Sequence, residues 1–299
     1  MVATIKGDLK WMILGANGQL GQALQLELGL NNLDFVALNH RQLDITNESD
    51  MSSAFHQIQP DVVVNAAAWT NVDLAEQEES SAYLVNAVGP RIAAQKSSEI
   101  GAKFVHISTD YVFSGSHLGP WAEDDAPCPV SAYGRTKAAG ERLVVNEGPA
   151  QTYIVRTAWL YSEYKSNFVK TMLKLAEEEF KSVQVVKDQV GQPTLANDLA
   201  IRIHQLIDQR LTPGIYHGTN SGEVSWYDCA REIFILKGAD PTRIVPVDSQ
   251  YYSRPAKRPS YSVLGHKNWL AEGVNPMRNW KDALKSALPT ILGQVELER

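Results

Sequence analysis

The chain has 299 residues, of which 44% are hydrophobic and 21% charged, which is typical of a folded globular protein and excludes a disordered, collagen-like or low-complexity chain. With 28 basic and 34 acidic side chains the net charge is −6, which argues against binding to nucleic acid or to an anionic membrane surface. The two cysteines, Cys128 and Cys229, lack the spacing of a zinc site or a disulfide framework. Residues 1–9 have no apolar core of a signal peptide, and no stretch approaches the ~20 apolar residues of a membrane span. We expect a soluble, cytoplasmic protein.

The first half of the chain alternates short apolar runs with amphipathic stretches. Their β-branched and aromatic residues predict strands buried on both faces at 11–14, 35–38, 62–64, 104–107 and 153–155. The amphipathic stretches predict helices at 19–28, 50–58, 78–100 and 131–146, with Thr46 and Asn47 as candidate caps of the second. Such alternation predicts an α/β protein with a Rossmann-like, doubly wound parallel sheet.

The pattern changes after about Arg156. Helices are expected at 167–179 and 196–209, and shorter elements are punctuated by Pro193, Pro213, Pro241, Pro246, Pro255 and Pro259. We therefore expect residues 1–158 to form a dinucleotide-binding domain and residues 159–299 mainly a smaller C-terminal substrate-binding lobe, with some later elements returning to the first domain. Ligands are expected at the carboxyl ends of the strands and in the cleft between the two parts.

A glycine-rich loop follows the first expected strand and opens a helix. Gly15, Gly18 and Gly21 allow a tight turn, close approach of a pyrophosphate and tight packing of the helix on the sheet. Backbone N–H groups at the helix start, those of Asn17, Gln19 and Leu20 among them, bind phosphate well. The loop predicts a dinucleotide site, although such a turn also occurs without a ligand.

The end of the second expected strand bears on the choice of dinucleotide. NAD-binding folds place a carboxylate there to hold the ribose hydroxyls, whereas this chain has Asn39-His40-Arg41. Arg41 is suited to pair with a 2′-phosphate, so NADPH is favoured, with NADH as the alternative and a solvated turn residue as the plain interpretation of Arg41. Asp44 and Ile45 are expected beside the adenine.

Tyr133 and Lys137 lie four residues apart at the start of an expected helix and so share one face. A tyrosine has a pKa of about 10, and a lysine one turn away lowers it toward working pH, which makes a general acid. Tyr161 and Lys165 have the same spacing. Tyr133 follows the hydroxyl side chain of Thr109 at the end of the fourth expected strand, whereas no comparable partner is identified before Tyr161, so Tyr133 is preferred.

Together, these features resemble the extended short-chain dehydrogenase/reductase superfamily. Four further segments, residues 65–76, 108–113, 156–161 and 188–194, narrow the resemblance to the dTDP-4-dehydrorhamnose reductases, and the similarity runs from the first strand to about Pro259. The resemblance implies NADPH-dependent reduction of the C4 ketone of dTDP-4-dehydro-β-L-rhamnose to dTDP-L-rhamnose, the last step of dTDP-rhamnose synthesis. The implied substrate is a nucleotide sugar, and the implied assembly is a monomer or homodimer.

The resemblance also implies roles for individual residues. Tyr133 would protonate the alkoxide forming at C4, Lys137 would lower the pKa of Tyr133 and bind the nicotinamide ribose, and Thr109 would hydrogen-bond the reacting oxygen. The implied cofactor-lining residues of the 65–76 segment are Ala67, Ala68 and Trp69. The implied substrate-binding residues are Asp110 and Trp159 near the sugar, and Asn167 and Arg258 near the diphosphate. Without the resemblance, Trp159 would be interpreted as a core aromatic, Asn167 as a helix cap and Arg258 as a surface charge.

The sequence departs from the family at Ala23 and in the tail beyond Trp269, where the match fades and no roles are assigned, and it leaves several alternatives. Some members dimerise around a metal held by an acidic residue just after the third glycine, where this chain has Ala23, so no such metal is expected. A dehydratase is disfavoured because Asp110 is followed by Tyr111 rather than by a glutamate base. An epimerase, a reductase of another dTDP-4-keto-deoxysugar, and a regulatory subunit like that of methionine adenosyltransferase remain as alternatives.

Overall fold

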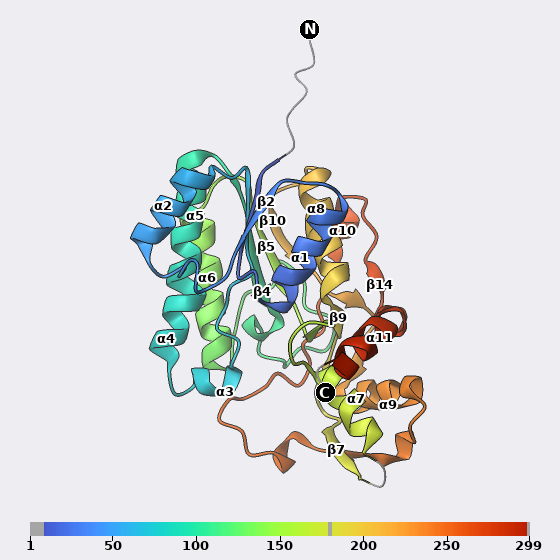
Figure 1. Ribbon diagram of the computed structural model, residues 1–299. Helices are drawn as coiled ribbons and strands as arrows, with labels where there is room; N and C mark the ends of the chain where they lie inside the picture. The colour runs from blue at the N-terminus through green and yellow to red at the C-terminus, as the bar shows by residue number, and fades with distance from the viewer. Residues whose placement is uncertain (1–8, 179–180, 298–299) are drawn as a thin grey trace.

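A six-stranded parallel sheet lies at the centre of the computed structural model, which describes residues 9–178 and 181–297 (Figure 1). Its spatial order is β10-β5-β4-β3-β1-β2. The strands are β1 (Trp11–Leu14), β2 (Phe35–Leu38), β3 (Val62–Asn65), β4 (Lys103–Thr109), β5 (Thr152–Thr157) and β10 (Gly214–His217). β2 lies on one side of β1, and the later strands β3, β4, β5 and β10 follow in order on the other side. The strand order therefore reverses between β1 and β3, which is where doubly wound folds bind their ligands.

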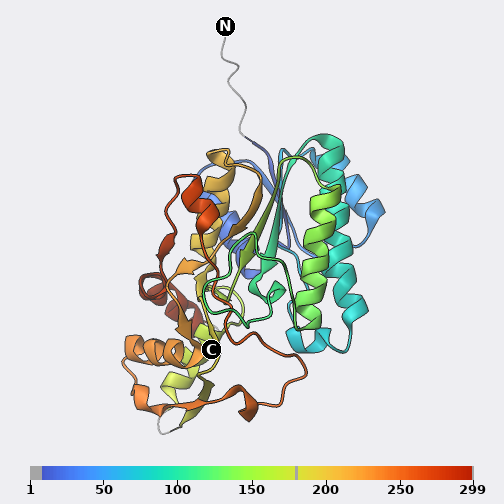
Figure 2. The same ribbon diagram turned by 180° about the vertical axis from the view of Figure 1, so that it is seen from behind.

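Helices cover both faces of this sheet (Figures 1 and 2). One face carries α2 (Glu48–Ile58), α5 (Gly89–Ile100) and α6 (Ala132–Glu147), and the other carries α1 (Gln19–Leu30) and α8 (Ala196–Asp208). Side chains alternate between the two cores, as strand geometry requires: Ile13 packs toward α1 and α8, whereas Met12 packs toward α2 and α5. The predicted doubly wound α/β fold is confirmed.

Burial differs between the predicted strands. Every residue of β1 and β3 is buried, as expected for strands covered on both faces. Every residue of β2 is only partly buried, because β2 lies at the edge of the sheet.

The predicted helix at 78–100 is interrupted. It consists of α4 (Glu79–Tyr83), a π-helical turn η1 (Leu84–Val88) and α5. Pro90 lacks the N–H that would continue the helical ladder to Asn86, so the ladder is broken at the start of α5. The side chain of Asn86, within this turn, accepts from the Trp69 N–H and donates to the Trp69 carbonyl and to Thr136 of α6, and these bonds hold the loop after β3 in place.

The later half of the chain forms a smaller lobe around a second core, and also returns to the sheet. Its longer helices are α7 (Phe168–Glu177), α9 (Trp226–Lys237) and α11 (Trp280–Leu297), which share that core. Short strand pairs complete it: β6 (Leu160–Tyr161) with β9 (Thr194–Leu195), β7 (Val183–Val186) with β13 (Ile244–Val247), β8 (Val190–Gly191) with β12 (Val224–Ser225), and β11 (Asn220–Ser221) with β14 (Met277–Asn279). β10 is a strand of the sheet and α8 covers one of its faces, although both follow residue 158. The domain boundary at 158/159 itself stays a prediction.

One stretch of the smaller lobe, residues 252–265, runs back along the first domain and is called the connecting segment here (Figure 1). Its backbone pairs with residues 115–121: Trp121 N–H donates to Val263, and Tyr261 N–H donates to Gly115. Two short helices flank the site described below, α3 (Val72–Ala75) and the 3-10 turn η2 (Asp110–Val112). Within the described ranges, no helix combines the length and apolar character needed to cross a membrane.

The close approach of α1 to β1 yields a stability prediction. A Cβ at Gly21 would collide with the backbone of Gly15 and Ala16, whereas a Cβ at Gly29 on the same helix would meet nothing within 4 Å. We expect Gly21→Ala to lower the free energy of unfolding by about 1–3 kcal/mol. The matched control, Gly29→Ala, should raise it by about 0.5–1 kcal/mol because alanine favours the helix. Chemical denaturation of both variants measures this, and equal effects would contradict the close approach.

Candidate active site

The glycine loop has the geometry of an anion cradle. Gly15 has a φ of 86°, and a Cβ there would come within 2.6 Å of the Ala67 nitrogen, so only glycine fits. Gly18 is the N-cap of α1 and makes no side-chain capping bond, so the first N–H groups of this twelve-residue helix are not satisfied by a cap. These groups point toward the carboxyl ends of β1 and β3 and fit a pyrophosphate.

Gln19 ties the start of α1 to the smaller lobe. Its side-chain amide donates to the carbonyl of Leu160 at 3.2 Å, and its oxygen accepts from Ser162 and Asn167, each at 3.0 Å. A cavity of about 180 Å³ opens beside these contacts, and Gln19, Trp159 and Asn167 all line it. The structure thus brings one predicted cofactor residue together with two predicted substrate residues.

The other predicted cofactor residues lie at the ends of β2 and β3. Arg41 is exposed in the turn after β2, where the side chain of Asn39 accepts from its backbone N–H. Asp44 accepts from the Thr46 backbone and hydroxyl, and Ile45 is buried against Gly89 of α5.

Ala67, Ala68 and Trp69 follow β3 and are partly buried. Backbone bonds to side chains hold this loop in place: the Ala67 N–H donates to Asn65, and the Trp69 N–H donates to Asn86.

The start of α6 is positioned by contacts that the sequence analysis missed. Ser131 caps the helix by accepting from the Gly134 N–H at 3.2 Å, and Glu76 accepts from the Ala132 N–H at 2.7 Å. Gly134 packs against the carbonyl of Tyr111, where a Cβ would not fit. These contacts fix the first turn of α6, which carries Tyr133, against the end of β4.

Tyr133 and Thr109 meet at the carboxyl end of β4. Thr109 and Asp110 are buried, and the Thr109 hydroxyl donates to Asp110 at 2.9 Å. Burial raises the pKa of Tyr133 to about 12, an effect opposed by its hydrogen bond with Thr109. Burial also raises the pKa of Asp110 to about 6, against hydrogen bonds from Ser262 and Thr109. The site thus holds a protonated phenol beside a hydroxyl and a buried carboxyl group.

Lys137 is directed into the sheet. Its Nζ donates to the Ile107 carbonyl at 2.6 Å and lies 3.3 Å from Nε2 of His106, and burial lowers its pKa to about 8. The acidification of Tyr133 by Lys137 stays a prediction.

The second tyrosine–lysine pair is not a pair in space. Tyr161 lies in strand β6, and Lys165 lies in the following loop with a φ of 56°, so their four-residue spacing does not fall on a helix. The Tyr161 hydroxyl is buried without a hydrogen-bond partner, and burial raises its pKa. The geometry therefore favours Tyr133 as the acid.

Trp159 stacks on Trp226, which the sequence analysis did not single out. The two rings lie 3.5 Å apart and 8° from parallel, and Gly191 leaves room for them. Trp159 has a φ of 46°, so its backbone bends sharply to place the ring at the cavity. No local pattern around Trp226 identifies it, because the pairing depends on how α9 packs in the smaller lobe.

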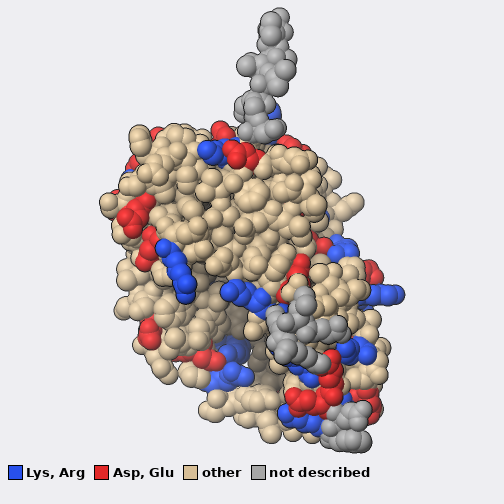
Figure 3. Space-filling view, in the orientation of Figure 1, with Lys and Arg blue, Asp and Glu red and all other residues tan. Residues whose placement is uncertain are grey.

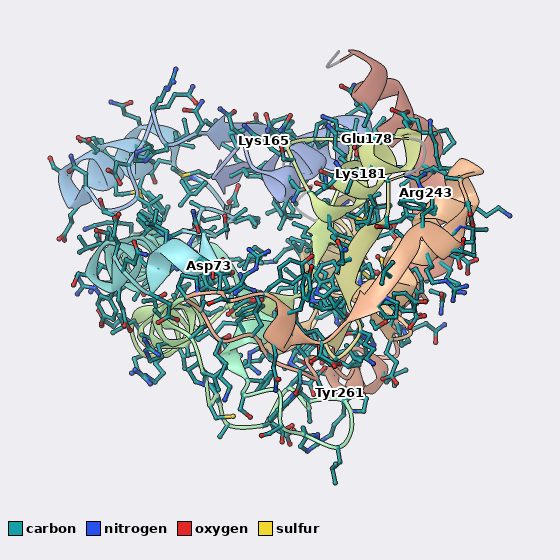
Figure 4. The ribbon with its side chains drawn as sticks, turned by 90° about the horizontal axis from the view of Figure 1, so that it is seen from below. Asp73, Lys165, Glu178, Lys181, Arg243 and Tyr261 are labelled. Atoms are coloured by element: carbon teal, nitrogen blue, oxygen red, sulfur yellow. The ribbon has the colours of Figure 1, made fainter. Side chains whose placement is uncertain are left out.

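Asn167 and Arg258 have protein partners. Asn167 caps α7 by accepting from the Lys170 N–H, as its alternative interpretation predicted. Arg258 binds both carboxylate oxygens of Asp73 of α3, at 2.9 and 2.7 Å. This contact, chiefly the Arg258 hydrogen bond, lowers the pKa of Asp73 to about 2. Figure 4 shows Asp73 beside the connecting segment, and Figure 3 shows a hollow between the two parts of the molecule bordered by basic side chains.

Comparison with known proteins places this site in a family. The family model described as RmlD substrate binding domain matches residues 9–292. The chain belongs to this family. The dTDP-4-dehydrorhamnose reductase of Streptomyces griseus is 45% identical over 289 residues, covering 95% of each chain. The dTDP-4-keto-6-deoxy-D-glucose reductase of Streptomyces niveus is 43% identical over 94% of this chain and 97% of its own.

A solved structure supports the same assignment. The dTDP-4-dehydrorhamnose reductase of Bacillus anthracis, crystallised in complex with NADP, has a TM-score of 0.91 and 39% identity over 95% of this chain and 99% of its own. The resemblance to dTDP-4-dehydrorhamnose reductases is confirmed, and with it the expectation of an oxidoreductase.

The Asp73 contact yields a prediction for the connecting segment. Arg258 bonds Asp73 twice, whereas Arg254 is half exposed and reaches Asp73 only at 3.5 Å. We expect Arg258→Ala to speed amide hydrogen exchange of residues 252–258 about tenfold or more, since charge-assisted bonds contribute about 1.5–3 kcal/mol each. Arg254→Ala, the matched control, should change it little.

The same contact has a predictable pH dependence. The Asp73–Arg258 contact lowers the Asp73 pKa from 3.8 to about 2. The stability that this contact gives to the folded protein is therefore complete above the ordinary pKa of 3.8 and is lost as the pH falls toward 2. Equal rates of amide hydrogen exchange in Arg258→Ala and Arg254→Ala would contradict the assignment of this contact to Arg258.

Proposed function

We propose that this protein reduces the C4 ketone of dTDP-4-dehydro-β-L-rhamnose to dTDP-L-rhamnose with NADPH, the last step of dTDP-rhamnose synthesis. The observation that carries the proposal is the meeting of the Tyr133 and Thr109 hydroxyls at the carboxyl end of β4, in a chain of this family. The name of the Streptomyces griseus relative supports the choice of substrate.

The proposed cofactor is NADPH, with NADH as the alternative. The cradle of Gly15, Gly18 and Gly21 and the uncapped start of α1 fit a pyrophosphate, and the Bacillus anthracis relative was crystallised with NADP. Arg41 is exposed at the end of β2, where it would meet a 2′-phosphate. When bound, this cofactor supplies the hydride.

In this proposal the chain's own residues orient the ketone and supply the proton. Tyr133 keeps its proton at neutral pH because its pKa is raised, and donates it to the oxygen at C4 as negative charge develops there. The Thr109 hydroxyl would hydrogen-bond the same oxygen once its single proton turns away from the buried Asp110, which accepts it in this structure. Lys137 would hold the nicotinamide ribose, and since its Nζ bonds the Ile107 carbonyl in this structure, binding would require it to turn toward the cofactor.

Other proposed contacts lie around the sugar nucleotide. Trp159 would pack on the sugar, and Asn167 and Arg258 would approach the diphosphate. Both polar residues are engaged by protein groups in this structure, so binding would require Arg258 to exchange Asp73 for phosphate. A cytoplasmic location and a monomeric or homodimeric state stay predictions.

A second candidate is a reductase of a different dTDP-4-keto-deoxysugar. The name of the Streptomyces niveus relative, at 43% identity, favours it as the alternative. The contacts of Tyr133 and Thr109 serve either substrate, because they act on the carbonyl rather than on the rest of the ring. Assay of NADPH oxidation with a panel of dTDP-4-keto sugars separates the two candidates.

Tyr133→Phe tests the proposal against a matched control. Loss of a general acid lowers kcat by about 10²–10⁴-fold. Tyr161→Phe removes a buried hydroxyl that has no partner and should leave kcat within a few-fold of wild type. NADPH oxidation with dTDP-4-dehydrorhamnose measures both.

Two outcomes would contradict the assignment of Tyr133. Full activity in Tyr133→Phe, or equal loss in both variants, would remove it from the role of acid. No turnover by the wild type with any sugar of the panel would instead support the regulatory alternative.

A further inference from the structure

A buried chain of hydrogen bonds links the loop after β3 to Lys137. The Ala67 N–H donates to Oδ1 of Asn65 at 3.2 Å, Nδ2 of Asn65 lies 3.2 Å from Nδ1 of His106, and Nε2 of His106 lies 3.3 Å from Nζ of Lys137. Asn65 and His106 are fully buried, and Lys137 is 1% exposed. This series of hydrogen bonds crosses from β3 through β4 to α6, and the Ala67 N–H at its start lies against Gly15 of the glycine loop.

The bond from the Ala67 N–H to Asn65 decides which atom donates and which accepts in every later hydrogen bond of the series. Because the Asn65 oxygen accepts from that N–H, its NH₂ group faces His106, and Nδ1 of the imidazole has to accept. A neutral imidazole has one acceptor and one donor nitrogen, so Nε2 carries the hydrogen. That hydrogen points at Nζ of Lys137, which meets it with a lone pair while donating its own N–H to Ile107.

An ammonium at Lys137 requires the reverse direction. Nε2 of His106 would then accept, Nδ1 would carry the hydrogen, and it would face the NH₂ group of Asn65. Turning the Asn65 amide would relieve that conflict but leave the Ala67 N–H facing another donor. Protonation of His106 to an imidazolium does not resolve the conflict between donors, since burial and then the charge of Lys137 hold the His106 pKa well below its usual range.

The charged groups around the pair only partly offset the effect of burial on the Lys137 pKa. Glu141, one turn further along α6, raises the Lys137 pKa, but burial outweighs it. Arg156 of β5 binds Glu141 through two bonds of 2.9 and 2.8 Å, which neutralises much of its charge. On the other side of the site, the charge of Asp110 of η2 raises the pKa of Tyr133 of α6.

We propose that Asn65 and His106 are positioning residues for Lys137, and that the direction of their hydrogen bonds opposes its ammonium form in the resting protein. The inference rests on the proposed function only in placing Lys137 in the active site. Neither residue touches the reacting atoms, so each acts through the lysine.

The tautomer of His106 tests the proposal directly. In protein labelled with ¹⁵N at histidine, measured at a pH of about 9 where imidazoles are neutral, the ring shifts of His106 should show a hydrogen on Nε2. The signal is assigned by its loss in His106→Phe. A hydrogen on Nδ1 would overturn the proposal. Because this measurement needs neither substrate nor turnover, its outcome is independent of the proposed function.

Asn65→Asp reverses the direction of these hydrogen bonds with almost no change in the shape of the side chain. Its carboxylate accepts from both the Ala67 N–H and Nδ1 of His106, so Nε2 becomes an acceptor and the ammonium of Lys137 is favoured. We expect the His106 tautomer to switch to Nδ1–H. We also expect the Lys137 pKa, followed by NMR of its side chain, to rise by about one unit or more, since a buried carboxylate favours a nearby positive charge.

Kinetics of the same variant separate positioning from a merely structural role. The fall of kcat/KM above a pH near the Lys137 pKa should move to higher pH in Asn65→Asp, whereas a packing defect would lower the rate equally at every pH. A folded Asn65→Asp with unchanged tautomer and unchanged Lys137 pKa would overturn the proposal. If the variant does not fold, the wild-type tautomer decides alone.

Discussion

The packing of α6 against the end of β4 is the constraint on which the site depends. Glycines allow α6 to approach this closely: Gly134 faces the carbonyl of Tyr111 just after β4, Gly140 faces that of Asn86 in the neighbouring η1, and neither position has room for a Cβ. Capping by Ser131 then fixes where the helix begins. Because the helix approaches so closely, its first turn brings Tyr133 to the Thr109 hydroxyl while its second turn directs a lysine into the sheet.

The two parts of the molecule are joined at this same edge of the sheet. Gln19 bonds three groups of the smaller lobe, and Asp73 holds the connecting segment through Arg258. Both anchors stand beside predicted ligand contacts, one at the cofactor phosphates and the other at the sugar nucleotide. Binding of either ligand would therefore act on the contacts that hold the lobes together.

Local patterns were enough to predict five of the six strands of the sheet, the glycine loop and the helix that carries Tyr133, whereas β10 was not predicted. Each of these is fixed by residues a few positions apart, whose periodicity or spacing is visible in the sequence. Two features escaped because they pair residues distant in the chain: Asp73 with Arg258, 185 positions apart, and Trp159 with Trp226. The direction of Lys137 also escaped, since it depends on which buried acceptors surround it.

The central claim is that the Tyr133 and Thr109 hydroxyls together hold the oxygen at C4 of the sugar. A crystal structure of the protein with NADP⁺ and dTDP-L-rhamnose tests it most directly. The account predicts that Oη of Tyr133 and Oγ1 of Thr109 both lie within about 3.2 Å of that oxygen. A well-ordered sugar whose C4 oxygen contacts neither hydroxyl, or contacts Tyr161 instead, would contradict it.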